Sequence, residues 1–303
     1  MSDGREQGRI HPRLATRWRE TEGSAAHARQ PTPGCVMRRF EMLRRVLVVG
    51  YGVIAYLLFL GVAVYMVGFL ANAVVPRGID EGASGSLAAA VVVNAALLGL
   101  FAVQHTVMAR PGFKRWWTRL IPPAIERSTF VLATSLVLVL VVWLWQPMPA
   151  TVWSVEAEWL RATLWAVYLL GWAIAVGSTF MIDHFDLMGL SQVVARARER
   201  PHVSPPFRTT LLYSVVRHPI MLGFLIAFWA TPDMTQGRLL FALLATGYIV
   251  VGVRFEERDL RAGLGVVYER YAAEVPSLVP TPRRRAGRRG AAVDADAHAT
   301  QDR

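Results

Sequence analysis

The sequence predicts an all-α fold, a polytopic membrane helical bundle with four full spans plus a short C-terminal helical hairpin. Hydrophobic residues make up 53% of the 303 residues and charged residues only 18%, a balance that is unusual for a soluble domain. Four segments contain no Asp, Glu, Lys or Arg, and each is long enough to cross about 30 Å of hydrocarbon as a helix. They are residues 46–76, 86–109, 128–155 and 162–182.

Two shorter apolar segments follow, at 218–232 and 239–253. They are uncharged but lie at or below the usual lower limit of about 17 residues for a membrane span. The turn-forming residues Pro232 and Gly237 lie between them. We therefore expect a hairpin that packs against the rest of the protein, not two independent spans.

Basic residues are concentrated in alternate loops. Segments 110–127 and 183–217 are rich in arginine, and arginines also precede the first span and follow the hairpin. Loops rich in Lys and Arg stay in the cytoplasm, so both termini are predicted to be cytoplasmic, in a bacterial cell membrane. The loops on the other side carry the acids Asp80, Glu81, Glu156 and Glu158.

The chain divides into three predicted parts. Residues 41–280 form the membrane domain, while 1–40 and 281–303 are polar, basic tails that we expect to be disordered. The net charge of +11 is spread along loops and tails, so anionic lipid headgroups account for it, and neither a nucleic acid nor a protein partner is expected. The only cysteine, Cys35, lies in the N-terminal tail, which excludes an internal disulfide.

Polar residues at membrane depth gather at the predicted cytoplasmic boundary. Three histidines from distant positions would form a site if they converge there, although each could instead be an interfacial histidine bonded to a helix-end carbonyl. Their spacing matches no local ligand motif, so no metal is predicted. The residues are Gln104-His105 at the end of the second span, Asp183-His184 at the end of the fourth, and Arg217-His218 before the hairpin.

The hairpin begins with a candidate anion site. Pro219 suits the first turn of a helix, which makes His218 the cap and puts Arg217 just outside. A helix N-terminus offers free N–H groups and a partial positive charge, and an adjacent guanidinium adds a two-pronged grip on a carboxylate or phosphate. The alternative is that Arg217 anchors the hairpin to lipid headgroups.

Adjacent carboxylates follow the hairpin. Glu256 and Glu257 point about 100° apart on a helix, so at most one should face the same pocket. Glu257 stands four residues before Arg261 and could form an exposed ion pair, which would leave Glu256 the freer. A ligand with an anionic and a cationic end, such as an amino-acid group, would bind both the anion site at Arg217 and a nearby glutamate carboxylate.

These motifs resemble a known family. Arg217-His218-Pro219, followed by Glu256-Glu257, Tyr268 and Tyr271, resembles the C-terminal half of the isoprenylcysteine carboxyl methyltransferase superfamily. Further elements are similar to the bacterial methanethiol S-methyltransferases, and the resemblance covers residues 46 to 280. Those elements are Gln104-His105, Lys114-Arg115-Trp116-Trp117, Ile125-Glu126-Arg127-Ser128 and Asp183-His184-Phe185-Asp186.

The resemblance implies an enzyme that uses S-adenosyl-L-methionine to methylate a small volatile thiol, methanethiol, to dimethyl sulfide. Prenyl-protein methyltransferases of the superfamily commonly carry an aromatic residue where Met221 stands here, which favours the small thiol as substrate. The cofactor's amino-acid end would meet Arg217 and the helix end. The implied cofactor-binding residues are Arg217, His218, Glu256, Glu257, Tyr268 and Tyr271.

A thiol acceptor must lose its proton, and a reference thiol pKa of about 8.5 leaves little thiolate at neutral pH. The candidate catalytic residues are His105, Asp183 and His184. Three alternatives stay open: carboxyl methylation of a lipid-linked or prenylcysteine-type substrate, a non-enzymatic membrane carrier, and a haem- or quinone-linked protein with His105 and His184 as paired ligands.

Overall fold

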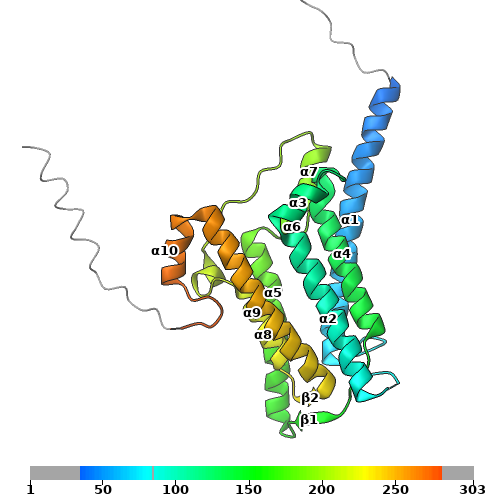
Figure 1. The fold of residues 1–303 in the computed structure, drawn as a ribbon, viewed down its shortest axis with the longest axis vertical. Helices are drawn as coiled ribbons and strands as arrows, with labels where there is room; N and C mark the ends of the chain where they lie inside the picture. Colours follow the sequence, from blue (N-terminus) through cyan, green and yellow to red (C-terminus); the bar gives the residue numbers. More distant parts are fainter. Residues whose placement is uncertain (1–34, 84, 282–303) are drawn as a thin grey trace, which may run out of the picture. The chain divides into compact units, whose positions relative to one another are not determined.

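The structure is a computed structural model that describes residues 35–83 and 85–281, which are mostly helical (Figure 1). The chain divides into two units, Met1–Arg44 and Arg45–Arg303. In the first unit, the described residues are the opening turns of α1 (Cys35–Ala71), and the fold below is that of the second unit. The predicted tails 1–40 and 281–303 lie outside the described residues, apart from 35–40 in α1 and Thr281.

Within the described residues, five helices are long and apolar enough to cross a membrane, which confirms the predicted polytopic helical bundle. They are α1, α2 (Leu87–Ala109), α4 (Pro123–Leu144), α5 (Glu158–Ile182) and α9 (Gln236–Leu264). The shorter helices are α3 (Pro111–Trp117), α6 (His184–Leu187), α7 (Leu190–Ala197), η1 (Leu211–Ser214), α8 (Pro219–Trp229) and α10 (Val266–Glu274). Two short strands, β1 (Thr151–Ser154) and β2 (Asp233–Thr235), pair antiparallel.

The C-terminal hairpin differs from the prediction. Its first arm, α8, is short as expected, but its second arm, α9, is a 29-residue helix that is also long and apolar enough to cross a membrane. The prediction stopped at Val253 because charged residues follow it. In the structure two of these charges are paired: Asp259 accepts a hydrogen bond from Arg110 at 2.8 Å, and Glu257 accepts hydrogen bonds from several donors. Paired charges let the helix continue.

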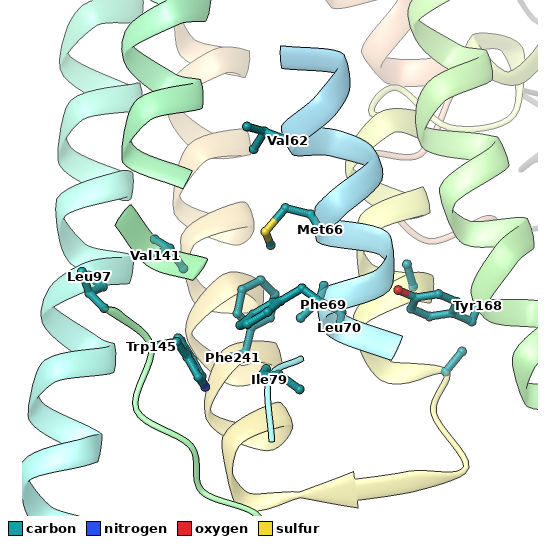
Figure 2. Close-up of a cluster of buried hydrophobic side chains, with 12 residues drawn as sticks. Val62, Met66, Phe69, Leu70, Ile79, Leu97, Val141, Trp145, Tyr168 and Phe241 are labelled. Atoms are coloured by element: carbon teal, nitrogen blue, oxygen red, sulfur yellow. The ribbon is translucent and has the colours of Figure 1, made fainter. Parts of the chain in front are cut away.

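The bundle has two ends. β1 and β2 lie at one end, here called the sheet end, and α3, α6 and α7 lie at the other, here called the site end (Figure 1). Toward the sheet end, large apolar side chains fill the space between the helices (Figure 2). Phe69 of α1 meets Trp145 edge-on with ring centroids 6.1 Å apart, and Trp145 meets Phe241 of α9 at 6.0 Å. This cluster joins α1, α4 and α9 into one core.

A buried polar network closes the sheet end. The guanidinium of Arg238, near the start of α9, lies 3.2 Å from Asp80 Oδ2 in the loop after α1. It also donates to Thr231 Oγ1 at 2.7 Å, to the Asp233 carbonyl at 2.8 Å and to the Ala71 carbonyl at 3.1 Å. One arginine thus links the end of α1 to the turn between α8 and α9. No sequence motif points to this network.

Helices α5 and α8 approach closely because each carries a glycine at the crossing. A Cβ added to Gly223 would lie 2.5 Å from the Ala175 backbone nitrogen and 2.6 Å from the Gly171 carbonyl oxygen. Glycine at such a crossing lets two backbones pack directly, which is how many membrane helices associate. The close packing sets the position of α8, and therefore of His218 at its start.

Gly223→Ala should destabilise the protein by about 1–3 kcal/mol, because the added methyl group has only backbone to displace. Gly177→Ala in α5 is the matched control, since a Cβ there meets nothing within 4 Å. We expect the control to be neutral or to stabilise by up to about 1 kcal/mol. Thermal unfolding of both variants in detergent measures the difference, and equal unfolding temperatures would contradict the proposed packing role of Gly223.

Candidate active site

Glu257 is the centre of a buried cluster at the site end. Its carboxylate oxygen Oε1 accepts hydrogen bonds from Arg217 Nε at 3.0 Å and Ser277 Oγ at 2.9 Å, and it is also bonded to Arg217 Nη2. His218 Nε2 lies 3.3 Å away, and Arg261 Nη2 bonds to Oε2 at 3.2 Å. Glu257 is only 9% exposed. The predicted pair with Arg261 is present, but the expectation that it would be exposed is wrong, because α8 and the C-terminal segment cover Glu257.

The guanidinium of Arg217 donates its hydrogen bonds to other groups of the protein. Besides Glu257, its Nη1 donates to the carbonyl oxygens of Ala272 at 3.0 Å and Val275 at 2.6 Å. The Arg217 and His218 N–H groups donate to the carbonyls of Pro276 and Ser277 at 2.9 and 3.1 Å. In this arrangement Arg217 fastens the segment after α10 to the start of α8. The predicted grip on an external carboxylate would require Arg217 to release Glu257.

Glu256 is the freer carboxylate. Its side chain is 50% exposed, and Oε2 lies 3.4 Å from His218 Nδ1. His218 caps α8, and Pro219 occupies the first helical position as predicted. Within the described part of the chain, the N–H groups of Ile220 and Met221 donate to no protein acceptor. The half-exposed carboxylate of Glu256 and these two N–H groups therefore form a candidate site for a polar ligand.

Tyr268 and Tyr271 are buried on α10 and hold the preceding loop. The Tyr271 hydroxyl donates to the Tyr213 carbonyl at 2.6 Å, and Phe207 packs edge-on against both rings. Burial, followed by the proximity of Tyr268, raises the pKa of Tyr271 to about 12, so the hydroxyl is protonated at neutral pH. Both tyrosines thus position the loop that precedes Arg217.

His105 lies in an aromatic enclosure between α2, α4 and α9. Its ring stacks on Phe101 at 5.3 Å and lies 4.9 Å from Phe130 and 6.4 Å from Tyr248. Nδ1 is 3.4 Å from Thr134 Oγ1, while Nε2 has no hydrogen-bond partner among the described residues. An imidazole with one free nitrogen can accept a proton from a small thiol, while the surrounding apolar rings disfavour the charged imidazolium form.

His184 has no free ring nitrogen. Nε2 bonds to the Tyr56 hydroxyl at 3.0 Å, Nδ1 bonds to Thr179 Oγ1 at 2.8 Å, and the ring stacks on Phe180 at 4.2 Å. Burial lowers the pKa of His184, opposed by Asp183, so the ring is neutral at neutral pH. This arrangement suits a structural histidine, not a proton acceptor.

Asp183 lies elsewhere, at the cap of α6. Its Oδ1 accepts the Asp186 N–H at 3.0 Å, and it lines a cleft of about 410 Å³ at the site end. Sequence reasoning did not assign most of this cleft to the site, although several of its residues belong to the quoted motifs. The cleft is lined by Lys114, Pro123, Glu126, Arg127, Ile182, Asp183, Asp186, Leu187, Gln192, His202, Ser204 and Pro205.

The three predicted histidines therefore lie in three separate neighbourhoods, and Asp183 lines the cleft. His218 lies in the Glu257 cluster, His105 in the aromatic enclosure and His184 against α1 and α5, and the described residues show no contact between any two of these histidines. Among those residues, no group of three or more His, Cys, Asp or Glu side chains is arranged to hold a metal ion. The expected convergence of the three histidines is not seen.

A bundle in which five of the described helices are long and apolar enough to cross a membrane defines a polytopic integral membrane protein. The methanethiol S-methyltransferase of Mycobacterium tuberculosis (strain ATCC 25618 / H37Rv) is 54% identical over 242 residues, covering 80% of this chain and 99% of that protein. Methanethiol S-methyltransferase 2 of Bradyrhizobium diazoefficiens is 51% identical over 241 residues, covering 79% and 92%. The chain belongs to the methanethiol S-methyltransferase family.

A more distant relative matches a shorter part of the chain. Nurim of Sus scrofa is 33% identical over 174 residues, covering 54% of this chain and 66% of that protein. No family model and no solved structure matches the chain. The predicted family membership is confirmed by the relatives named methanethiol S-methyltransferase.

Proposed function

We propose that this protein methylates methanethiol to dimethyl sulfide with S-adenosyl-L-methionine as methyl donor. The observation that carries the proposal is the 54% identity across nearly the whole of a relative named for this activity. When bound, S-adenosylmethionine supplies an electrophilic sulfonium methyl group that a thiolate displaces in line. Catalysis of this kind depends mainly on positioning and on exclusion of water.

The residues around Glu256 fit the donor. We assign its half-exposed carboxylate to hydroxyl groups of the donor's ribose, and the free N–H groups of Ile220 and Met221 to the donor's acceptor atoms. His218 orients Glu256 through the 3.4 Å contact between Nδ1 and Oε2. Arg217, Glu257 and Tyr271 then act as positioning residues, because their polar groups bind other parts of the chain. Tyr268 contributes through its ring, which packs against Phe207, while its buried hydroxyl has no hydrogen-bond partner among the described residues.

We assign the thiol proton to His105. The free Nε2 accepts it, and the rings of Phe101, Phe130 and Tyr248 keep water away from the sulfur. A volatile, membrane-permeable thiol can reach such an apolar enclosure without a polar channel. Asp183, at the opening of the cleft, and His184, with both nitrogens bonded, are less suited to accept this proton.

The proposed setting is a bacterial cell membrane with both termini in the cytoplasm. The support is the basic character of the loops at the site end, which include Arg115, Arg119 and Arg196 and suit anionic lipid headgroups. The exposed side chain of Trp116 on α3 suits the interfacial region. This orientation opens the donor site to the cytoplasm, where charged S-adenosylmethionine is dissolved.

The test is headspace chromatography over purified protein supplied with S-adenosylmethionine and methanethiol. Dimethyl sulfide should form, and His105→Asn should lower its rate at pH 7 by at least about tenfold. Raising the pH toward 9 should restore much of the activity of this variant, because the thiol then ionises without a base. A purely structural role for His105 would give no such recovery.

Other outcomes separate the alternatives. Methylation of a prenylcysteine carboxylate without dimethyl sulfide would replace the substrate but keep the reaction class. Failure to consume S-adenosylmethionine with any acceptor would favour a carrier. A haem absorbance spectrum of the purified protein would favour a redox protein.

A further inference from the structure

The cleft at the site end is lined by two cations, Lys114 and Arg127, that form no ion pair with the residues the structure describes. Arg127, at the start of α4, donates from Nε to the Leu187 carbonyl at 2.7 Å and lies over the Phe130 ring at 5.0 Å. Among the described residues, neither its terminal nitrogens nor Lys114 Nζ lies within ion-pair distance of a carboxylate. Burial, followed by the proximity of Arg127, lowers the pKa of Lys114. A bound anion would favour the charged form of Lys114 and offset its repulsion by Arg127.

Free carboxylate oxygens lie in the same cleft. Glu126 makes no hydrogen bond or ion pair with the described residues, and Asp183 uses only Oδ1, as the cap of α6. Asp186 is already engaged by Gln192 at 3.1 Å and by His202. The cleft thus contains two cations and two carboxylates that form no ion pair with the described residues, although Glu126 lies near enough to act electrostatically on both cations. This combination suits a ligand with charges of both signs.

The size of the cleft is also suitable. About 410 Å³ lies in the range of small-molecule sites, roughly 300–1,000 Å³, and exceeds what a single ion requires. The donors of Arg217, the residue predicted to hold a carboxylate, are taken by Glu257, Ala272 and Val275. A ligand carboxylate at the site end therefore finds free cationic donors at Lys114 and Arg127.

We propose that this cleft binds an α-amino-acid group, with Lys114 and Arg127 on its carboxylate and Glu126 and Asp183 on its ammonium. The group has two possible sources, the methyl donor itself or a free amino acid such as methionine. If the source is the methyl donor, the inference rests on the proposed function. The donor's ribose then binds at Glu256 and its amino-acid group binds in the cleft.

The experiment compares three ligands by calorimetric titration of the full chain in nanodiscs: S-adenosylhomocysteine, 5′-methylthioadenosine, which lacks the amino-acid group, and methionine. Lys114→Gln should weaken S-adenosylhomocysteine binding by about tenfold or more and leave 5′-methylthioadenosine binding within about twofold. Arg115→Gln is the matched control on the same helix, because Arg115 does not line the cleft. Glu126→Gln is a second variant in case Lys114→Gln fails to fold.

Each result decides between outcomes. Selective loss of S-adenosylhomocysteine binding assigns the cleft to the donor, while selective loss of methionine binding assigns it to a free amino acid. Equal effects on all three ligands, or none, in both variants would overturn the proposal. Failure of the wild-type protein to bind S-adenosylhomocysteine or to form dimethyl sulfide would instead contradict the proposed function.

Discussion

Glu257→Leu should destabilise the protein by about 3–5 kcal/mol, because it leaves the Arg217 guanidinium buried without its counter-charge. The Arg217 side chain is 9% exposed, and Glu257 accepts hydrogen bonds from it through Nε and Nη2. The same change also removes the acceptor of Ser277. Thermal unfolding in detergent should show a large fall in the unfolding temperature, with early loss of the segment after α10.

Glu256→Leu is the matched control for this prediction. Glu256 is the preceding residue on the same helix, but its side chain is 50% exposed, so folding should be little affected. Dimethyl sulfide formation should nevertheless fall by at least about tenfold if Glu256 holds the donor. Equal stability of the two variants would contradict the division between a positioning glutamate and a ligand-facing glutamate.

Arg238→Met should destabilise the protein by a similar amount, about 3–5 kcal/mol, because it leaves Asp80 buried without its counter-charge. Arg238 is 8% exposed, and its removal also takes a donor from the Ala71 carbonyl and from Thr231. Arg254→Met, at an exposed position on α9, is the control and should be nearly neutral.

The readout for Arg238→Met is thermal unfolding together with the yield of folded protein in membranes. Loss of the link between α1 and the turn before α9 should lower both quantities. Wild-type stability in this variant would mean that the sheet end is held by the apolar cluster of Phe69, Trp145 and Phe241 alone.

The four uncharged spans were predictable because a bilayer selects long apolar helices by composition alone. The length of α9 was not predictable. Asp259 and Glu257 can lie within a long helix only if they find partners, and those partners lie far away in sequence. Arg110 is 149 residues from Asp259, and Arg217 is 40 residues from Glu257. Local patterns do not reveal such pairs.

The candidate site was predictable in part. Helix geometry showed that Glu256 and Glu257 diverge, but it did not show which one α8 covers. His105 and His184 looked equivalent at helix ends, and only their contacts separate a free Nε2 from a fully bonded ring. Lys114 and Arg127 were visible in two motifs, while their shared cleft depends on tertiary packing.

The most direct test of the central claim uses purified protein in liposomes with S-adenosylmethionine that carries a trideuterated methyl group, and unlabelled methanethiol. Mass spectrometry of the headspace should show dimethyl sulfide with one deuterated methyl group, formed at the same rate as S-adenosylhomocysteine. Glu256→Leu protein, folded in the same liposomes, should form little of either product. Consumption of the donor without labelled dimethyl sulfide, or no consumption at all, would contradict the assignment of this chain as a methanethiol-methylating enzyme.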